Sequence, residues 1–186
     1  MSVGHSRRHS PAESHETERV LADPRVKARL AQRPKIDRGY DLPYLGGYSQ
    51  DGRTIYFDRH FPASGIKVAG KLVNVLPFLL THEYTEKTLI DVMGYTYKAA
   101  HEIATQAEHA KVREAGINPQ DYEAALKPYV KADALEKLVR VAPDLDPAPY
   151  IQTNDKPVLR RIRAVMRPAD WERATKGAKL DLGQQG

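Results

Sequence analysis

The stretch Leu76–Met93 most constrains how this chain folds, because a single helical face there is both apolar and titratable. At about 100° per residue, that face collects four apolar residues, one imidazole and two carboxylates. These residues are Leu76, Leu79, Ile90 and Met93, together with His82, Glu83 and Glu86. Buried groups of this kind must be satisfied by a metal ion or by a network of ion pairs. The sequence therefore predicts a buried polar site and leaves both interpretations open.

The next predicted helix supplies further polar groups to the same region. Gly94 is a candidate left-handed C-cap of the first helix, and Thr96 is the predicted N-cap of a helix from Tyr97 to about Glu114. Such a short connection favours two helices packed side by side. Two polar residues seven positions apart lie on one edge of the buried face of the second helix. They are His101 and Glu108, and Tyr97 lies beside them.

The segment His82-Glu83-x-x-Glu86 differs at one position from a known metal-binding motif. It resembles the His-Glu-x-x-His helix of the zincin-like metallopeptidases, and the resemblance covers about residues 40–116. This resemblance implies an edge strand, a metal-binding helix and a second helix that supplies the last ligand. It implies His82 and Glu86 as ligands, with His101 or Glu108 as the third, and Glu83 as the general base. The chain is also similar to small phage and proteobacterial proteins of unknown function.

The donor types narrow the choice of metal. The sequence contains no cysteine, so the ligands must be imidazoles and carboxylates. Zinc is the expected divalent metal, and the carboxylate at Glu86 makes the site harder and admits manganese or iron. The rival interpretation is a closed polar network in which His82 bonds to Glu86. In that network Glu83 would reach one of three cations, which are Arg59, Lys71 and Lys111.

A predicted β-hairpin precedes the helices. Asp51-Gly52 is a turn signal between residues 45–49 and the strand 54–58. Alternation along that strand places Tyr56, Asp58 and His60 on one face, where they would line a cleft together with Tyr97. A substrate peptide would pair with this strand through its backbone. The predicted fold class is α+β: a small antiparallel hairpin or sheet followed by a mostly helical body with a zincin-like core.

Turn and proline signals divide the chain into five parts. They are a disordered tail (1–10), an N-terminal helical extension (11–34), an α+β core (35–141), a linker (142–154) and a basic helical C-terminal extension (155–186). Within the core, a helix that begins at Asn118-Pro119 is predicted to break or kink near Pro128 and to resume to about Arg140.

Charge is unevenly distributed along the chain. Residues 1–40 carry nine Lys/Arg against five Asp/Glu, and residues 155–181 carry eight against four, whereas residues 41–154 carry twelve against fifteen. Basic ends of this sort bind nucleic acid or an acidic partner, here through Arg160, Arg161 and Arg163. Ordinary solvated helix faces are the alternative interpretation.

Three functional hypotheses follow. The leading one is a small metal-dependent hydrolase, a peptidase among the candidates, that acts on a peptide or a small molecule. The second is a structural or assembly protein, for instance of a phage particle, with a non-catalytic His/Glu cluster. The third is a basic accessory protein that binds nucleic acid. No apolar run reaches the roughly 20 residues of a membrane span, so a cytoplasmic or particle-associated protein without a membrane partner is expected.

Overall fold

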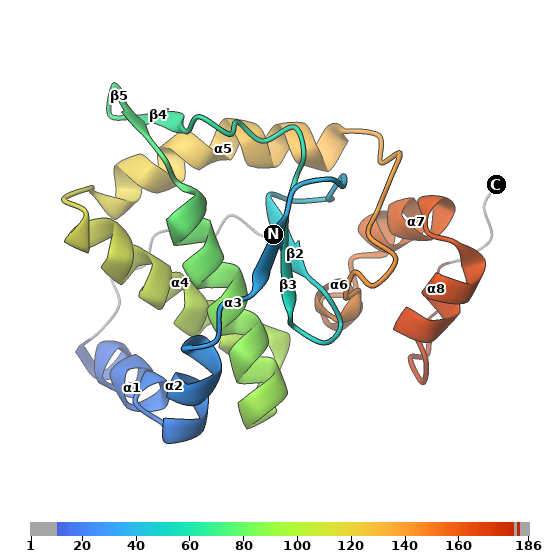
Figure 1. The fold of residues 1–186 in the computed structure, drawn as a ribbon, viewed down its shortest axis with the longest axis horizontal. Helices are drawn as coiled ribbons and strands as arrows, with labels where there is room; N and C mark the ends of the chain where they lie inside the picture. The colour runs from blue at the N-terminus through green and yellow to red at the C-terminus, as the bar shows by residue number, and fades with distance from the viewer. Residues whose placement is uncertain (1–10, 181, 183–186) are drawn as a thin grey trace.

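The computed structural model describes residues 11–180 and residue 182, and the predicted disordered tail 1–10 lies outside this range. The fold is α+β, with small sheets followed by a helical body, as predicted (Figure 1). The helices are α1 (Pro11–Leu21), α2 (Pro24–Leu30), α3 (Leu76–Met93), α4 (Tyr97–Glu114), α5 (Pro119–Leu135), α6 (Ala148–Gln152), α7 (Lys156–Val165) and α8 (Pro168–Ala174). The strands are β1 (Lys35–Asp37), β2 (Gly46–Tyr48), β3 (Thr54–Phe57), β4 (Ile66–Val68) and β5 (Lys71–Val73).

The main sheet has the strand order β1-β3-β2. The predicted hairpin is confirmed, because β2 and β3 pair antiparallel on either side of the Asp51-Gly52 turn. Strand β1, where no strand was predicted, pairs in parallel with β3. Since β3 is bonded on both sides, it is the central strand, and the prediction that a peptide would pair along it is wrong.

The outer edge of β2 is covered by residues 144–146, which belong to the predicted linker. The Gln50 amide donates to the Asp144 carbonyl at 2.8 Å, and the Asp146 amide donates to the Tyr48 carbonyl at 2.9 Å. The Lys87 ammonium on α3 fixes the same segment through the Asp146 carboxylate, at 2.9 Å. This part of the chain is therefore bonded to both the sheet and α3.

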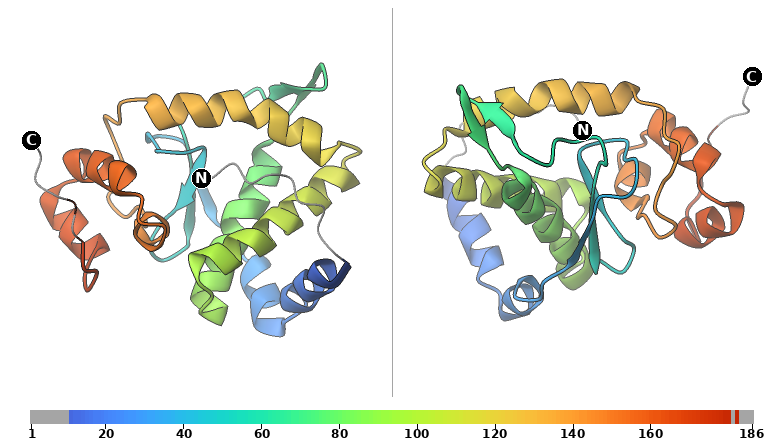
Figure 2. Two further views of the ribbon diagram at one scale, coloured as in Figure 1. Left: turned by 180° about the vertical axis from the view of Figure 1, so that it is seen from behind. Right: turned by 45° about the horizontal axis from the view of Figure 1, so that its top comes forward.

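Helices α3 and α4 have the bounds that periodicity and capping predicted. Gly94 ends α3 in the left-handed conformation, with φ 69°, and the Thr96 hydroxyl caps α4 by accepting from the Ala99 amide. Ala100 and Ala104 are fully buried, and residues this small let the two helices lie close together. The pair lies side by side in all views (Figures 1 and 2).

Helix α5 differs from its prediction. It runs without a break through Pro128 and ends at Leu135, five residues before the predicted end at Arg140. Packing along the helix opposes the loss of the hydrogen bond that proline removes, because Tyr122 and Leu126 before Pro128, and Tyr129 and Val130 after it, pack in one hydrophobic core. The C-terminal half of α5 consequently crosses the end of the sheet (Figure 2).

The C-terminal helices α7 and α8 share an apolar core with residues around the main sheet. Its largest members are Leu42, Tyr56, Leu138, Leu145, Tyr150, Leu159, Ile162, Met166 and Trp171. Two of the three arginines that suggested a nucleic-acid surface bond internally: Arg160 donates to the Leu182 carbonyl and Arg161 to the Ala134 carbonyl. Arg163 is exposed. Among the described helices, none has both the length and the apolar character needed to cross a bilayer.

Candidate metal centre

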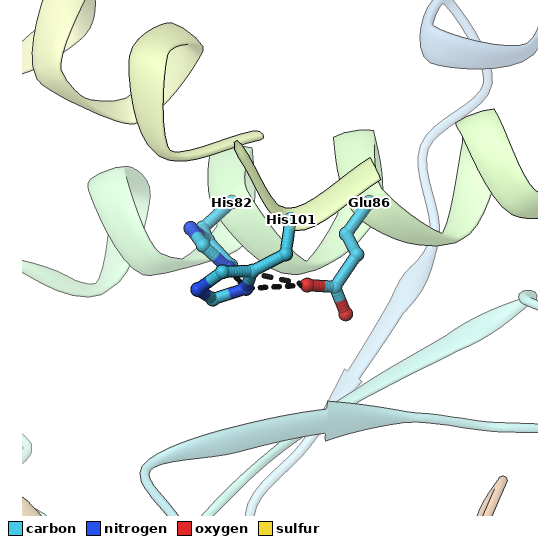
Figure 3. Close-up of side chains that lie close together, drawn as sticks. All are labelled: His82, Glu86 and His101. Atoms are coloured by element: carbon cyan, nitrogen blue, oxygen red, sulfur yellow. Dashed lines mark hydrogen bonds and ion pairs between the residues drawn. The ribbon is translucent and has the colours of Figure 1, made fainter. Parts of the chain in front are cut away.

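Three donor atoms from α3 and α4 converge at one point, which Figure 3 shows between the two helices and the sheet. His82 Nε2 lies 3.0 Å from His101 Nδ1 and 3.5 Å from Glu86 Oε2. His101 Nδ1 lies 2.7 Å from Glu86 Oε2. We call these three residues the histidine cluster. They converge because His82 and Glu86 are one turn apart on α3 and the tight turn brings His101 opposite them.

The spacing of these atoms fits a small metal ion. Zinc binds imidazole and carboxylate at about 2.0–2.1 Å, and a tetrahedron of that size has ligand–ligand edges of about 3.3 Å. The three separations of 2.7, 3.0 and 3.5 Å lie around this edge length. Two imidazoles and one carboxylate form a donor set suited to zinc, iron or manganese.

Two of the three cluster residues, His82 and Glu86, are held by another group on the side that faces away from the shared point. His82 Nδ1 lies 2.9 Å from Glu108 Oε2, and the other oxygen of Glu108 accepts a short hydrogen bond from the Tyr122 hydroxyl. The Tyr48 hydroxyl donates to Glu86 Oε1 at 2.9 Å. A carboxylate behind a histidine fixes its tautomer and ring orientation, as is usual around protein-bound metals. Glu108, predicted as a ligand, lies instead behind His82.

Burial and the charges within the cluster shift the pKa values of His82 and Glu86. Burial alone lowers the pKa of His82, but hydrogen bonds to Glu108 and Glu86 outweigh it and hold that pKa well above its usual value. Burial raises the pKa of Glu86, yet the two histidines bring it down to about 2. Without a metal, the cluster is an ion-pair network with a protonated imidazole. A metal ion would have to displace that proton.

Glu83 is the predicted base, and its carboxyl lies beside the cluster in a different environment. It is 5% exposed, and burial, followed by the charge of Glu86, raises its pKa to about 8. It makes no hydrogen bond to a described residue. Arg59, Lys71 and Lys111, the cations proposed for it, do not reach it, and Lys111 instead donates to the Thr81 hydroxyl. Glu83 is therefore a buried carboxyl without a structural partner.

A small cavity lies next to Glu83 and Glu86. Its volume is about 20 Å³, enough for one water molecule. Four tyrosines line it, with residues of β2 and of the segment that covers β2; the tyrosines are Tyr44, Tyr48, Tyr97 and Tyr150. Gly46 allows this approach, because a Cβ at that position would lie 2.6 Å from Glu83 Oε1.

Of the four residues predicted to line a cleft, only Tyr97 borders this cavity. Tyr56 donates to Asp144 at 2.6 Å, and the Asp58 and His60 side chains lie at the far end of β3. The reason is that β2, and not β3, faces the site. Sequence reasoning missed Tyr48, Tyr122 and Tyr150, whose contacts with the site depend on long-range packing. The close approach of Gly46 was signalled only by the Gly46-Gly47 pair.

Comparison of the chain with protein-family models, with curated proteins and with solved structures finds no match.

Proposed function

We propose that this protein is a small metal-dependent hydrolase with a zincin-like core, whose metal is held by His82, Glu86 and His101. The proposal rests on the convergence of these three donor atoms, which two consecutive helices bring to one point. The carboxylate of Glu108 and the hydroxyl of Tyr48 orient two of the ligands from behind. A salt-bridge network needs no such common point of approach.

The chemistry divides between the metal and Glu83. A metal held by His82, Glu86 and His101 would supply Lewis acidity to a bound water and to the carbonyl of a substrate. Glu83 accepts a proton from the attacking water as the oxygen–carbon bond forms. It then returns that proton to the leaving group as the bond between carbon and leaving group breaks. Glu83 has no hydrogen-bond partner among the described residues, and a cation held beside it would lower its raised pKa, which would leave the carboxylate ionised and free to accept the proton.

The substrate class follows from what covers the site. The β2 edge nearest the cavity is bonded to residues 144–146, so an extended peptide has no strand to pair with there. The tyrosines around the cavity offer flat apolar surfaces and hydroxyl groups. The cavity itself has room for the attacking water only, so the substrate carbonyl would approach from its open side, which suits a small amide or ester better than a long polypeptide.

The metal is tested by elemental analysis of the purified protein beside His82→Ala. A matched control is His15→Ala, which alters an exposed histidine on α1. We expect one equivalent of metal in the wild type and in the control, and background metal in His82→Ala. If all three proteins hold only background metal, and added zinc leaves the melting temperature unchanged, the cluster is an ion-pair network and the assembly-protein hypothesis gains.

Catalysis is tested separately with Glu83→Gln. This change keeps the shape of the side chain and removes its ability to accept a proton. We expect full metal content and loss of hydrolysis across a panel of chromogenic small esters and amides. Loss of metal in this variant would show that Glu83 is a ligand rather than the base.

A further inference from the structure

A second group of carboxylates lies far from the histidine cluster, where the end of β3 meets the C-terminal end of α5. Asp58 directly follows β3, Asp133 lies in the last turn of α5, and Glu136 follows that helix. One oxygen atom from each of these residues lies within 4.8 Å of the others. We call these three residues the acidic cluster.

Asp133 is the unusual member. Asp133 is only 5% exposed, and its Oδ2 is buried without a hydrogen-bond partner among the described residues. A buried carboxylate left in this way costs free energy, so structures usually provide a donor or a cation for it. Burial, and then the charges of Asp58 and Glu136, raise the pKa of Asp133 to about 7. The carboxyl of Asp133 therefore points into a region of negative potential.

Asp58 is held rigidly in the same place. It is fully buried, its Oδ2 accepts from the Leu42 amide at 2.8 Å, and its Oδ1 accepts from the His60 amide at 2.7 Å. Each oxygen keeps a second lone pair for another partner. Asp58 is thus a fixed acceptor whose second lone pairs remain for a cation.

The cationic side chains nearby are engaged elsewhere. Arg59 pairs with Asp41, and Arg161 donates to the backbone carbonyls of Asp133 and Glu136 rather than to their carboxylates. His60 Nε2 lies 3.0 Å from Glu136 Oε1 and is the one basic side chain paired with the acidic cluster within the described residues. Three carboxylates therefore face one another with one paired basic side chain, and the charges of His60 and Arg161 together do not outweigh burial and the neighbouring carboxylates at Asp133.

We propose that Asp58, Asp133 and Glu136 form a second metal site, one that binds a hard divalent cation of the Mg²⁺, Ca²⁺ and Mn²⁺ class. Carboxylate oxygens with completing water molecules are the ligands such ions prefer. The bound ion ties the end of α5 to the end of β3 and thereby fixes the helix across the sheet. This site differs in chemistry from the histidine cluster, and it stands whether or not the protein is a hydrolase.

The alternative is a proton in place of the ion, shared between Asp133 and Asp58. The two cases differ in the variant Asp133→Asn, whose amide replaces the protonated acid but cannot replace a cation ligand. A matched control is Asp121→Asn, which changes an exposed aspartate in the first turn of the same helix. Asn at position 133 removes a buried charge and is expected to fold.

The experiment measures melting of chelator-treated protein with MgCl₂, CaCl₂ or MnCl₂, against KCl at equal ionic strength. We expect at least one of these cations to raise the melting temperature of the wild type, of Asp121→Asn and of His101→Ala. In Asp133→Asn combined with His101→Ala, which removes a ligand of the histidine cluster, the rise disappears, or its midpoint moves to at least about tenfold higher cation concentration than in His101→Ala alone. An equal rise in the double variant and in His101→Ala, or no rise with any cation in His101→Ala, overturns the proposal.

Direct binding provides a second measurement that does not depend on stability. Mn²⁺ in solution has a paramagnetic resonance signal that weakens when the ion binds protein. In His101→Ala, which lacks a ligand of the histidine cluster, we expect one remaining Mn²⁺ equivalent. Adding Asp133→Asn to that variant should abolish it, and retention of that equivalent would contradict the assignment.

Discussion

The histidine cluster and the acidic cluster use similar side chains but satisfy them differently. At the histidine cluster, both ring nitrogens of His82 are hydrogen-bonded, and the oxygens of Glu86 are hydrogen-bonded to Tyr48 and His101. At the acidic cluster, Asp58 is met by two backbone amides, whereas Asp133 is met by none. One cluster is complete as a network of ion pairs, and the other is incomplete without an added cation.

This difference concerns the folded state without metal. A complete network holds the metal ligands in place before a metal binds. Removing one residue of that network should therefore lower the free energy of unfolding even in the absence of metal. An unpaired buried carboxylate destabilises the fold, so replacing it should not lower the free energy of unfolding. The effect of a substitution on stability therefore depends on the hydrogen-bond partners of a carboxylate and not on its carboxylate neighbours alone.

The largest expected effect follows from Glu108→Ala. The change leaves His82 Nδ1 and the Tyr122 hydroxyl buried without an acceptor, which costs about 3 kcal/mol and lowers the melting temperature by about 6–12 °C. The control is Glu102→Ala, which alters an exposed glutamate on the same helix and should change little. Equal melting of the two variants would mean that the network does not stabilise the fold.

The second effect separates two aspartates at the same end of the molecule. Asp41 is buried; burial raises its pKa, but the Val139 and Arg140 amides and then Arg59 outweigh burial and hold that pKa below its usual value. Asp41→Asn should therefore cost about 2 kcal/mol at neutral pH, whereas Asp133→Asn should not destabilise chelated protein.

The pH dependence of the Asp41 contribution has a definite sign. Because the folded pKa is lowered, the stabilisation is present above the unfolded pKa of about 4 and disappears as the pH falls through the lower folded value. Urea unfolding of wild type and Asp41→Asn at pH 7 and pH 3 measures this. A gap between the two proteins that widens at pH 3 would contradict the assignment.

The third effect concerns Glu83. In Gly46→Ala the new Cβ would lie 2.6 Å from the Glu83 carboxylate and displace it, whereas in Gly47→Ala the nearest atom is 3.4 Å away. We expect Gly46→Ala to keep its metal and to lose about tenfold or more in hydrolysis, with near-normal activity in Gly47→Ala. Equal activity of the two variants would remove Glu83 from the reaction.

The smallest effect tests the group behind Glu86. Tyr48→Phe removes one hydrogen bond to Glu86 Oε1, which should weaken metal binding about tenfold and cost about 1 kcal/mol. Tyr84→Phe is the control, because its hydroxyl donates to the Arg29 carbonyl, away from the cluster. Zinc titrations of the two variants should differ although their stabilities are similar.

Much of the histidine cluster could be predicted because its residues are close in sequence. Helical periodicity placed His82 and Glu86 on one face, and the Gly94 turn made α4 their neighbour. Periodicity could not distinguish the roles of His101 and Glu108, since that depends on side-chain direction. Nor could it find Tyr48 and Tyr122, which reach the cluster from β2 and α5.

The acidic cluster could not be predicted at all. Asp58 was assigned to the cleft, and Asp133 and Glu136 are ordinary charged residues at the end of a helix pattern. They meet because α5 continues through Pro128 and ends over the sheet, whereas a break or kink was predicted at that proline. Strand β1 could not be predicted either, because its three residues are too few to show an alternating pattern.

X-ray absorption at the zinc edge can show whether His82, Glu86 and His101 hold one metal ion. Zinc is added in one equivalent to chelator-treated wild type and to His101→Ala. We expect two imidazole nitrogens and carboxylate oxygen at about 2.0–2.1 Å in the wild type, and one imidazole fewer in the variant. A wild-type spectrum with only oxygen neighbours, or one identical to that of His101→Ala, would contradict it.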